Sequence, residues 1–283
     1  MGVKEVHVDT ITETVARLCQ EANYFLPEDA MAALEKAKQE EQSPCAQGIL
    51  RHILENAKVA AEERVPLCQD CGVTIVYLYI GQDIHIVGGN LRSAVIEGVS
   101  RGYKEGYLRA SMVEHPFSSR TNTGDNTPPI IRYEVVSGDN LRIIVMPKGE
   151  GAENASCVAM LDPASGRKGV IDTVINCIDQ RGSKICPPLI VGVGVGATAG
   201  KVMSLAKNAL LRPLGQHNLD PEVAELEYEL LERINASGIG AQGVGGTVTA
   251  LAVHAEMMPC HIAALPVGVN PCCHSSRHKE AVL

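Results

Sequence analysis

The stretch PLCQDCGVTIVYLYI, residues 66–80, places two cysteines and an aspartate directly before a run of β-branched and aromatic residues. The run Val73–Ile80 has the length and composition of a strand. The polar cluster Cys68–Gly72 is therefore expected at a strand edge or in a loop. This stretch separates a helical N-terminal part from a mixed remainder, and for that reason it decides the fold class.

The residues before and after this stretch differ in their hydrophobic pattern. Residues 1–65 carry apolar positions at helical spacing, with helix-start signals at Pro27-Glu28-Asp29 and Ser43-Pro44. Beyond residue 80, predicted helices (91–108, 169–180, 198–211 and one from Asp220-Pro221 to before Gly238) alternate with predicted strands (141–146 and 189–195). No repeat or composition break marks a linker. The sequence predicts one α+β domain over residues 1–283, in which a helical region at 1–65 precedes a mixed α/β core of strands flanked by helices.

Composition excludes several classes of protein. The chain has 283 residues, a formal net charge of −8 and 45% hydrophobic residues, and it contains no Lys/Arg run longer than two. Such a chain buries enough surface to fold without disulfides, and it lacks the basic footprint of nucleic-acid binding. No apolar stretch reaches the length of a membrane span, and no signal-peptide core follows residues 1–5. We therefore expect a cytoplasmic protein that does not bind membranes, whose ten cysteines are packing residues, metal ligands or catalytic thiols.

Three cysteine sites differ from the others because each lies in a polar or Pro/Gly-rich loop. They are Cys68 in L-C-Q-D-C-G, Cys186 in K-I-C-P-P, and the pair Cys272-Cys273 in N-P-C-C-H. Cysteines in apolar, near-helical patterns instead behave as small hydrophobic residues, and these are Cys19, Cys157 and Cys177. Thiolates that come together from distant loops are what a metal or iron–sulfur site requires.

The pair Cys68-x-x-Cys71 alone is open to three interpretations: a redox dithiol, half of a zinc site, or coincidence. A thioredoxin-like dithiol precedes a helix, whereas a predicted strand follows here. Zinc could be completed by Cys272, Cys273, His274 or His278, although the compact paired spacing of a structural finger is missing. A non-catalytic zinc or redox-sensing protein is therefore the alternative class, which iron and sulfide content would separate from an iron–sulfur enzyme.

Four further residues are candidates for a site, each with a simpler structural explanation. Asp70 and Gln69 adjoin Cys68, but an aspartate beside a glycine is also typical of a turn. Arg109 could bind a carboxylate through two hydrogen bonds, although exposed arginines are mostly solvated. His261 has apolar neighbours and could be a buried core histidine. The glycines of G-V-G-V-G at 192–196 lack the dinucleotide-binding spacing, so close packing of a strand on a helix explains them.

Several ordered motifs together resemble one family. They are L-C-Q-D-x-G at 67–72, N-T-G-D-N-T-P at 122–128, C-P-P followed by G-V-G-x-G at 186–196, G-I-G-A-Q at 238–242, and L-P-V near a final Cys and R-H. In this order they resemble the α subunit of the class I, iron–sulfur-dependent fumarate hydratase and L-tartrate dehydratase family. The resemblance covers nearly the whole chain from about residue 10 onward.

The resemblance implies a [4Fe–4S] cluster held by Cys68, Cys186 and Cys273, with one iron open to the substrate. It places Gln69, Arg109, Gly149 and Gly151 around the substrate, and Asp70 and His261 in proton handling. Two residues depart from the family pattern: Cys71 stands where similar sequences usually have Thr, and Cys272 has no counterpart as a ligand.

The implied reaction is the reversible hydration of fumarate to L-malate, a step of the tricarboxylic acid cycle, with the open iron acting as a Lewis acid on the hydroxyl. Dehydration of L-tartrate is the alternative within the family. Fused members carry a second, C-terminal domain with further substrate-binding residues. The resemblance therefore implies a separate β subunit, without which the chain is expected to be inactive, in a heterodimer or a dimer of heterodimers that acts on a small C4 dicarboxylate.

Overall fold

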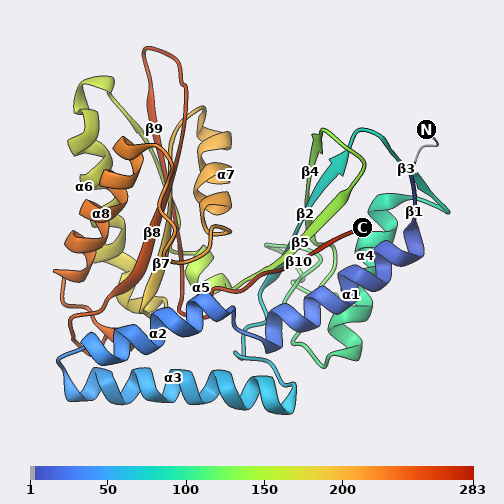
Figure 1. Cartoon of the computed structure of the whole chain (residues 1–283), viewed down its shortest axis with the longest axis horizontal. Helices are drawn as coiled ribbons and strands as arrows, with labels where there is room; N and C mark the ends of the chain where they lie inside the picture. The colour runs from blue at the N-terminus through green and yellow to red at the C-terminus, as the bar shows by residue number, and fades with distance from the viewer. Residues whose placement is uncertain (1–3) are drawn as a thin grey trace. The chain divides into compact units, whose positions relative to one another are not determined.

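A computed structural model describes residues 4–283 (Figure 1). The chain divides into two compact units, each assembled from separate segments of sequence. The first unit comprises the residues up to Leu26, Ala57–Glu150 and Arg277–Leu283, and the second comprises Pro27–Asn56 and Gly151–Ser276. The predicted α+β class is confirmed, because helices flank several separate sheets.

The first unit is built on a four-stranded sheet in the order β10-β5-β2-β4. Its central pair is antiparallel, β2 (Val73–Gly81) against β5 (Leu141–Lys148); β4 (Ile130–Val136) pairs in parallel with β2, and β10 (Lys279–Val282) pairs antiparallel with β5. Two helices, α1 (Val8–Tyr24) and α4 (Leu91–Glu105), pack on one face of this sheet (Figure 1). A short parallel pair, β1 (Lys4–His7) and β3 (Ile84–Val87), completes the unit.

Glycine lets α4 approach α1 closely. A Cβ at Gly102 would lie 2.7 Å from the carbonyl oxygen of Ala16. Because the two helix backbones meet there, the apolar residues on either side of this contact pack against the sheet. The buried side chains of this core include Ile11, Val15, Leu18, Val76, Leu78, Val95, Val99, Ile143 and Val145.

The second unit contains a four-stranded sheet in the order β6-β9-β7-β8. Its strands are β6 (Cys157–Leu161), β9 (Leu265–Cys272), β7 (Leu189–Gly196) and β8 (Ala250–Met258), of which only the β7–β8 pair is parallel. Helices α6 (Gly166–Arg181) and α8 (Pro221–Asn235) cover one face, and α7 (Ala199–Ala209) covers the other (Figure 1). The remaining helices are α2 (Glu28–Glu40), α3 (Pro44–Glu63) and the short α5 (Glu150–Glu153).

The glycines of β7 explain how α7 reaches the sheet. A Cβ at Gly192 would lie 2.0 Å from the carbonyl oxygen of Ala206, and one at Gly194 would lie 2.2 Å from that of Val202. Any larger residue would push the helix away from the strand. The interpretation of G-V-G-V-G as packing glycines is therefore confirmed.

The predicted helices and strands all occur, with small changes at their ends, but several strands were not predicted. These are β1, which begins the region expected to be helical, and β3, β4, β6, β8, β9 and β10. Most are short or rich in small residues, so their pairing depends on neighbours distant in sequence more than on local pattern. Among the described residues, no helix is both long enough and apolar enough to cross a membrane.

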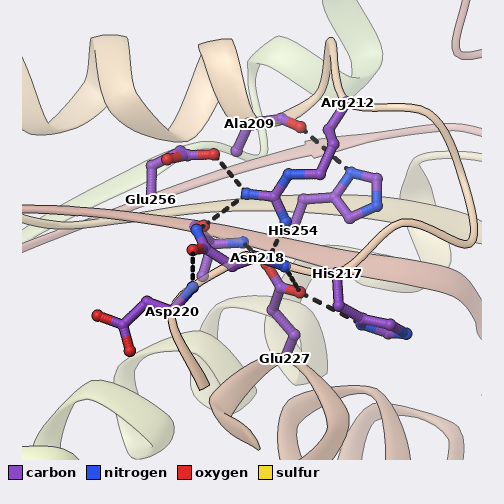
Figure 2. Close-up of polar contacts among 9 residues, drawn as sticks. Ala209, Arg212, His217, Asn218, Asp220, Glu227, His254 and Glu256 are labelled. Carbon is purple, nitrogen blue, oxygen red and sulfur yellow. Dashed lines mark hydrogen bonds and ion pairs between the residues drawn. The ribbon is translucent and has the colours of Figure 1, made fainter. Parts of the chain in front are cut away.

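A buried polar network ties the loop after α7 to β8 and α8 in the second unit (Figure 2). The buried carboxylate of Glu227 accepts hydrogen bonds from Arg212 Nη1 at 2.5 Å, from the Asn218 backbone N–H at 3.1 Å and from the Ala255 backbone N–H at 2.7 Å. Its other neighbour is His217 Nδ1, at 3.3 Å. The Glu227 carboxylate thus has a donor for each of its lone pairs. These hydrogen bonds offset the free energy that is lost when a charged group leaves water.

His254 of β8 lies in the same network and is buried. Its Nδ1 donates a hydrogen bond to the carbonyl oxygen of Ala209 at 3.2 Å. Burial lowers the pKa of His254 to about 4, and the charge of Arg212 acts in the same direction, against the opposing charge of Glu227. The folded protein therefore holds this imidazole neutral.

We predict that this histidine makes the second unit sensitive to acid. Since its pKa is depressed on folding, the unfolded chain binds a proton first, so stability is complete above about pH 6.5 and falls as the pH drops towards 4, by up to about 3 kcal/mol. The measurement is chemical denaturation of wild type and His254→Asn, which retains a donor for Ala209, at several pH values from 7 to 4. The variant should show a shallower pH dependence over this range; equal slopes would contradict the prediction.

Candidate functional site

The loop that carries Cys68 is fixed at both ends within the first unit. The backbone N–H of Leu67 donates to the carbonyl oxygen of Asn23 at 2.9 Å. Gly72 has φ +74°, and a Cβ there would lie 2.7 Å from the backbone of Lys148. The turn of this loop into β2 therefore requires glycine. Cys68 is half-buried; its Sγ accepts the backbone N–H of Asp70 at 3.4 Å and donates to Gln69 Oε1 at 3.4 Å.

Asp70 joins this loop to the one that follows β5. Its Oδ1 accepts the backbone N–H of Gly72 at 2.8 Å, and its Oδ2 accepts that of Glu150 at 2.8 Å. A Cβ at Gly149 would lie 3.4 Å from Asp70 Oδ2, so the small residue leaves the carboxylate accessible from that side. Gly151 follows in α5 and is exposed.

Arg109 and Gln69 lie at the same place. The backbone N–H of Arg109 donates to Cys71 Sγ at 3.2 Å, and its Nη1 donates to the carbonyl oxygen of Gln69 at 3.4 Å. Both side chains are exposed. The first unit thus brings together five of the predicted site residues, namely Cys68, Gln69, Asp70, Arg109 and Gly149.

Two buried side chains behind the loop were not predicted as individual residues. Tyr103 Oη donates to the carbonyl oxygen of Cys71 at 2.7 Å. Asn126 donates from Nδ2 to the carbonyl oxygen of Gly72 at 3.0 Å and accepts the backbone N–H of Ser111 at Oδ1 at 2.8 Å. The signal for Asn126 was present, because it lies in the motif N-T-G-D-N-T-P.

Arg277 is the third residue that was not predicted individually, although it belongs to the R-H motif near the final Cys. It is 3% exposed, and its Nη2 donates to the carbonyl oxygen of Asp70 at 2.5 Å. Its Nε and Nη1 are buried without a hydrogen-bond partner among residues 4–283. A buried guanidinium with two unused donors complements an anionic group. Burial raises the pKa of the Cys71 thiol, and the N–H of Arg109 and the charge of Arg277 partly offset this.

In the second unit, Cys186 and Cys273 lie at one end of the sheet. Cys186 is exposed and has φ +55°, an unusual conformation for a non-glycine residue. The backbone N–H and Nδ1 of His274 both donate to its carbonyl oxygen, at 3.4 and 3.0 Å. Ile190 of β7 pairs with Cys272 of β9. Cys273, which follows β9, and Cys186, which precedes β7, therefore lie at the same edge of the sheet. Cys273 is partly exposed, whereas Cys272 is 4% exposed.

The glycine-rich loop at 238–246 supports this end of the sheet. Gln242, at φ +53°, donates its backbone N–H to the carbonyl oxygen of Pro187 at 2.8 Å. The loop is held in turn by Glu41, at the end of α2, whose carboxylate accepts the backbone N–H groups of Thr247 and Val248 at 2.9–3.0 Å. It also accepts those of Gln42 and Ser43 at 2.8 Å. Burial acts to raise the pKa of Glu41, but these hydrogen bonds outweigh it, so the pKa is lowered.

His261 lies elsewhere in the second unit. It is exposed in the connection between β8 and β9, and its Nδ1 accepts the backbone N–H of Ala263 at 3.1 Å. Strand β9, whose eight residues span about 25 Å, runs from this connection to Cys272. The unit therefore does not bring His261 to the end that carries Cys186 and Cys273, and its role in proton handling stays a prediction. It is not the buried core histidine that its apolar neighbours indicated.

The donor set fits an iron–sulfur cluster by its chemistry. The three loop cysteines Cys68, Cys186 and Cys273 are soft donors that keep some exposure. The buried guanidinium of Arg277, with two unsatisfied donors, is bonded to the loop of Cys68 through the carbonyl oxygen of Asp70. Cys71 is 1% exposed and packs in the core, which does not favour a Cys68–Cys71 zinc or redox pair. Within either unit, the described residues include no group of three or more His, Cys, Asp or Glu side chains that could hold a metal by themselves.

Comparisons with known proteins identify the family of the chain. Residues 12–282 match the model of the fumarate hydratase (Fumerase) family. A protein of Methanocaldococcus jannaschii with the provisional name L(+)-tartrate dehydratase subunit alpha is 44% identical over 272 residues, which cover 94% of this chain and 95% of that protein. The L(+)-tartrate dehydratase subunit alpha of Escherichia coli strain K12 is 30% identical over 278 residues, covering 97% and 91% of the two chains.

The anchor at Glu41 generates a prediction about the second unit. Glu41→Gln replaces one acceptor oxygen by a donor facing backbone N–H groups, so we expect it to lower the free energy of unfolding by about 3 kcal/mol. The control is Glu40→Gln, which alters only an exposed carboxylate 3.8 Å from Lys36 Nζ and should change stability by less than about 0.5 kcal/mol. Denaturant titration of both variants provides the measurement, and equal stabilities would show that Glu41 does not hold the loop.

Proposed function

The chain belongs to the fumarate hydratase family, and from this premise we propose that it is the α subunit of a two-subunit iron–sulfur hydro-lyase. The α-subunit names of the two relatives support a separate β subunit, because their alignments cover more than nine tenths of each chain. Its substrate would be a small C4 dicarboxylate that gains or loses water. A heterodimer or a dimer of heterodimers would be the assembly.

We propose reversible hydration of fumarate to L-malate as the reaction, on the description of the matching family. Dehydration of L(+)-tartrate is the second candidate, favoured by the names of the relatives at 44% and 30% identity. Both reactions break or form a C–O bond next to a carbon that bears a weakly acidic hydrogen. They differ by one hydroxyl on the substrate, so a few polar contacts in the pocket decide between them.

We further propose that Cys68, Cys186 and Cys273 hold a [4Fe–4S] cluster. The supporting observation is the contrast within each neighbouring pair: Cys68 and Cys273 are accessible, whereas Cys71 and Cys272 are 1% and 4% exposed. When bound, such a cluster with one open iron supplies Lewis-acid chemistry at the substrate hydroxyl. A reducing compartment such as the cytoplasm, where we place the protein, keeps these thiols able to bind iron.

The chain's own residues would bind and orient the diacid. Arg109 is exposed beside Gln69, so its guanidinium can clamp a carboxylate while the amide of Gln69 contributes a further hydrogen bond. Gly149 and Gly151 leave space and offer backbone N–H groups near the start of α5. Arg277 would add a positive charge next to the loop of Asp70, and its two unused donors could bind an anionic group.

Asp70 is the proposed proton-handling group in the first unit. Its two oxygens each accept one backbone N–H, which fixes the carboxylate plane and leaves further lone pairs available. Oδ2, which faces Gly149, is the atom at which a proton would be held or passed on. His261 is the second proposed group, on an exposed connection.

The ligand assignment is tested by metal content. We predict that Cys186→Ala, co-expressed with the β subunit and purified without oxygen, loses most of the iron, acid-labile sulfide and broad visible absorption of the wild type. Cys272→Ala is the matched control and should retain all three. Zinc without sulfide in the wild type, or loss of iron in the Cys272 variant alone, would overturn the assignment.

The substrate-binding role is tested at Arg109. We expect Arg109→Gln to raise KM for the diacid at least about tenfold with unchanged iron content, because a bidentate charged hydrogen bond is lost. Arg120→Gln, which changes another exposed arginine of the same polar segment, should leave KM near the wild-type value. Rates with fumarate, L-malate and L(+)-tartrate identify the substrate as the one with the highest kcat/KM. Identical behaviour of the two variants would remove Arg109 from the site.

A further inference from the structure

Arg277 is a buried cation without a carboxylate partner among the described residues. It is 3% exposed, and its Nη2 donates to the carbonyl oxygen of Asp70 at 2.5 Å. Its Nε and Nη1 have no hydrogen-bond partner, and no acidic side chain of residues 4–283 forms an ion pair with it. Arg212, by contrast, is paired with the carboxylates of Glu227, at 2.5 Å, and Glu256. A buried charge costs free energy unless it is paired, so the environment of Arg277 requires an explanation.

The carboxylate of Asp70 does not neutralise Arg277, although the two residues are in contact. Asp70 Oδ1 accepts the backbone N–H of Gly72 and Oδ2 accepts that of Glu150, each at 2.8 Å. The carboxylate is thus used by main-chain donors, and the guanidinium is bonded to the carbonyl oxygen instead. Nε and Nη1 therefore require an anionic acceptor that residues 4–283 do not provide.

The burial of Arg277 indicates what kind of anion this acceptor is. A substrate enters and leaves in every turnover, so an arginine that binds it stays within reach of solvent, as the exposed Arg109 does. An enclosed arginine suits a group that is inserted once and remains bound. The loop leads to the same conclusion, because the backbone N–H of Asp70 donates to Cys68 Sγ at 3.4 Å while its carbonyl oxygen accepts from Arg277. A single residue thus connects the guanidinium to a proposed cluster ligand.

We propose that Arg277 is a positioning residue of the iron–sulfur centre: its Nε and Nη1 donate hydrogen bonds to sulfur of the bound cluster, and its charge compensates that of the cluster. This inference rests on the proposed function, because it needs a cluster at Cys68. A [4Fe–4S] core bound by three thiolates carries a net negative charge, and N–H donors and cations near its sulfurs raise its reduction potential. Arginine suits this role, because its charge is permanent and its donors lie in one plane.

The chain without a cluster tests whether Arg277 acts on the cluster or only holds the loop of Asp70. In this apo form, Arg277→Gln removes an unpaired buried charge and keeps an amide donor for the Asp70 carbonyl oxygen. The free energy of unfolding of the full-length apo chain, measured by denaturant titration with reduced thiols, should therefore stay close to that of the wild type. Arg101→Gln, which removes an exposed arginine 3.4 Å from Glu105, is the control for the change in net charge. A marked loss of stability in apo Arg277→Gln alone would make Arg277 a structural anchor and refute the proposal.

The complex with the β subunit, purified without oxygen, provides the direct measurement. We expect the wild type, Arg277→Lys, Arg277→Gln and Arg101→Gln to contain similar amounts of iron and acid-labile sulfide. The midpoint potential for one-electron reduction of the cluster by dithionite, followed by EPR spectroscopy, should shift to more negative values in Arg277→Gln. The shift should be smaller in Arg277→Lys, which keeps the charge, and absent in Arg101→Gln. A contact that is merely structural would change the cluster content without producing this order of potentials.

The outcomes separate this inference from the function on which it rests. A wild-type complex without iron and sulfide would overturn both. A wild-type complex that holds a cluster whose potential is unchanged in Arg277→Gln would remove the role of Arg277 and leave the hydro-lyase proposal intact. Loss of the cluster from both Arg277 variants, to the extent expected for Cys186→Ala, would show that Arg277 holds the loop instead, and would equally contradict the inference.

Discussion

The first unit depends on one carboxylate that accepts backbone hydrogen bonds. Asp70 is bonded to the N–H of Gly72 in its own loop and to the N–H of Glu150 after β5, so two segments about 80 residues apart are fixed to each other at 2.8 Å. The loop with Cys68, the start of β2 and the end of β5 all take their positions from this link. A carboxylate suits the task, since its lone pairs serve several donors in different directions.

The second unit uses the same device with another acid. Glu41 accepts N–H groups from its own neighbours and from Thr247 and Val248, about 200 residues away. The glycine-rich loop held by Glu41 carries Gln242, which donates to Pro187 beside Cys186. Each unit therefore positions a cysteine loop through an acid bonded to main-chain N–H groups. Because main-chain N–H groups supply most of the donors, such an anchor places few demands on the side chains of the loop it holds.

The sequence predicted those parts of the fold and site that depend on neighbouring residues. The helices around 8–24 and 221–235 and the strand at 73–81 follow from local periodicity and start signals. The group Cys68, Gln69 and Asp70 follows from one motif. The partners of that motif do not: Arg277 and Glu150 are distant in sequence, and nothing in their local pattern marks them as neighbours of Asp70. The division into two units could not be predicted from the sequence for the same reason, because the segments of the two units alternate along the chain.

Burial separates the roles of cysteines that the sequence could not distinguish. Cys71 and Cys272 each lie within three residues of an accessible cysteine, yet both are buried: Cys71 packs in the apolar core of the first unit, and Cys272 is the last residue of β9. For Cys71, a thiolate would have to lose its hydration, so burial raises the pKa of this thiol and makes it a poor ligand. Cys68 and Cys273 keep contact with solvent, so binding the proposed cluster would not carry that cost. Burial thus distinguishes the cysteines that pack in the core from those that stay accessible to a ligand.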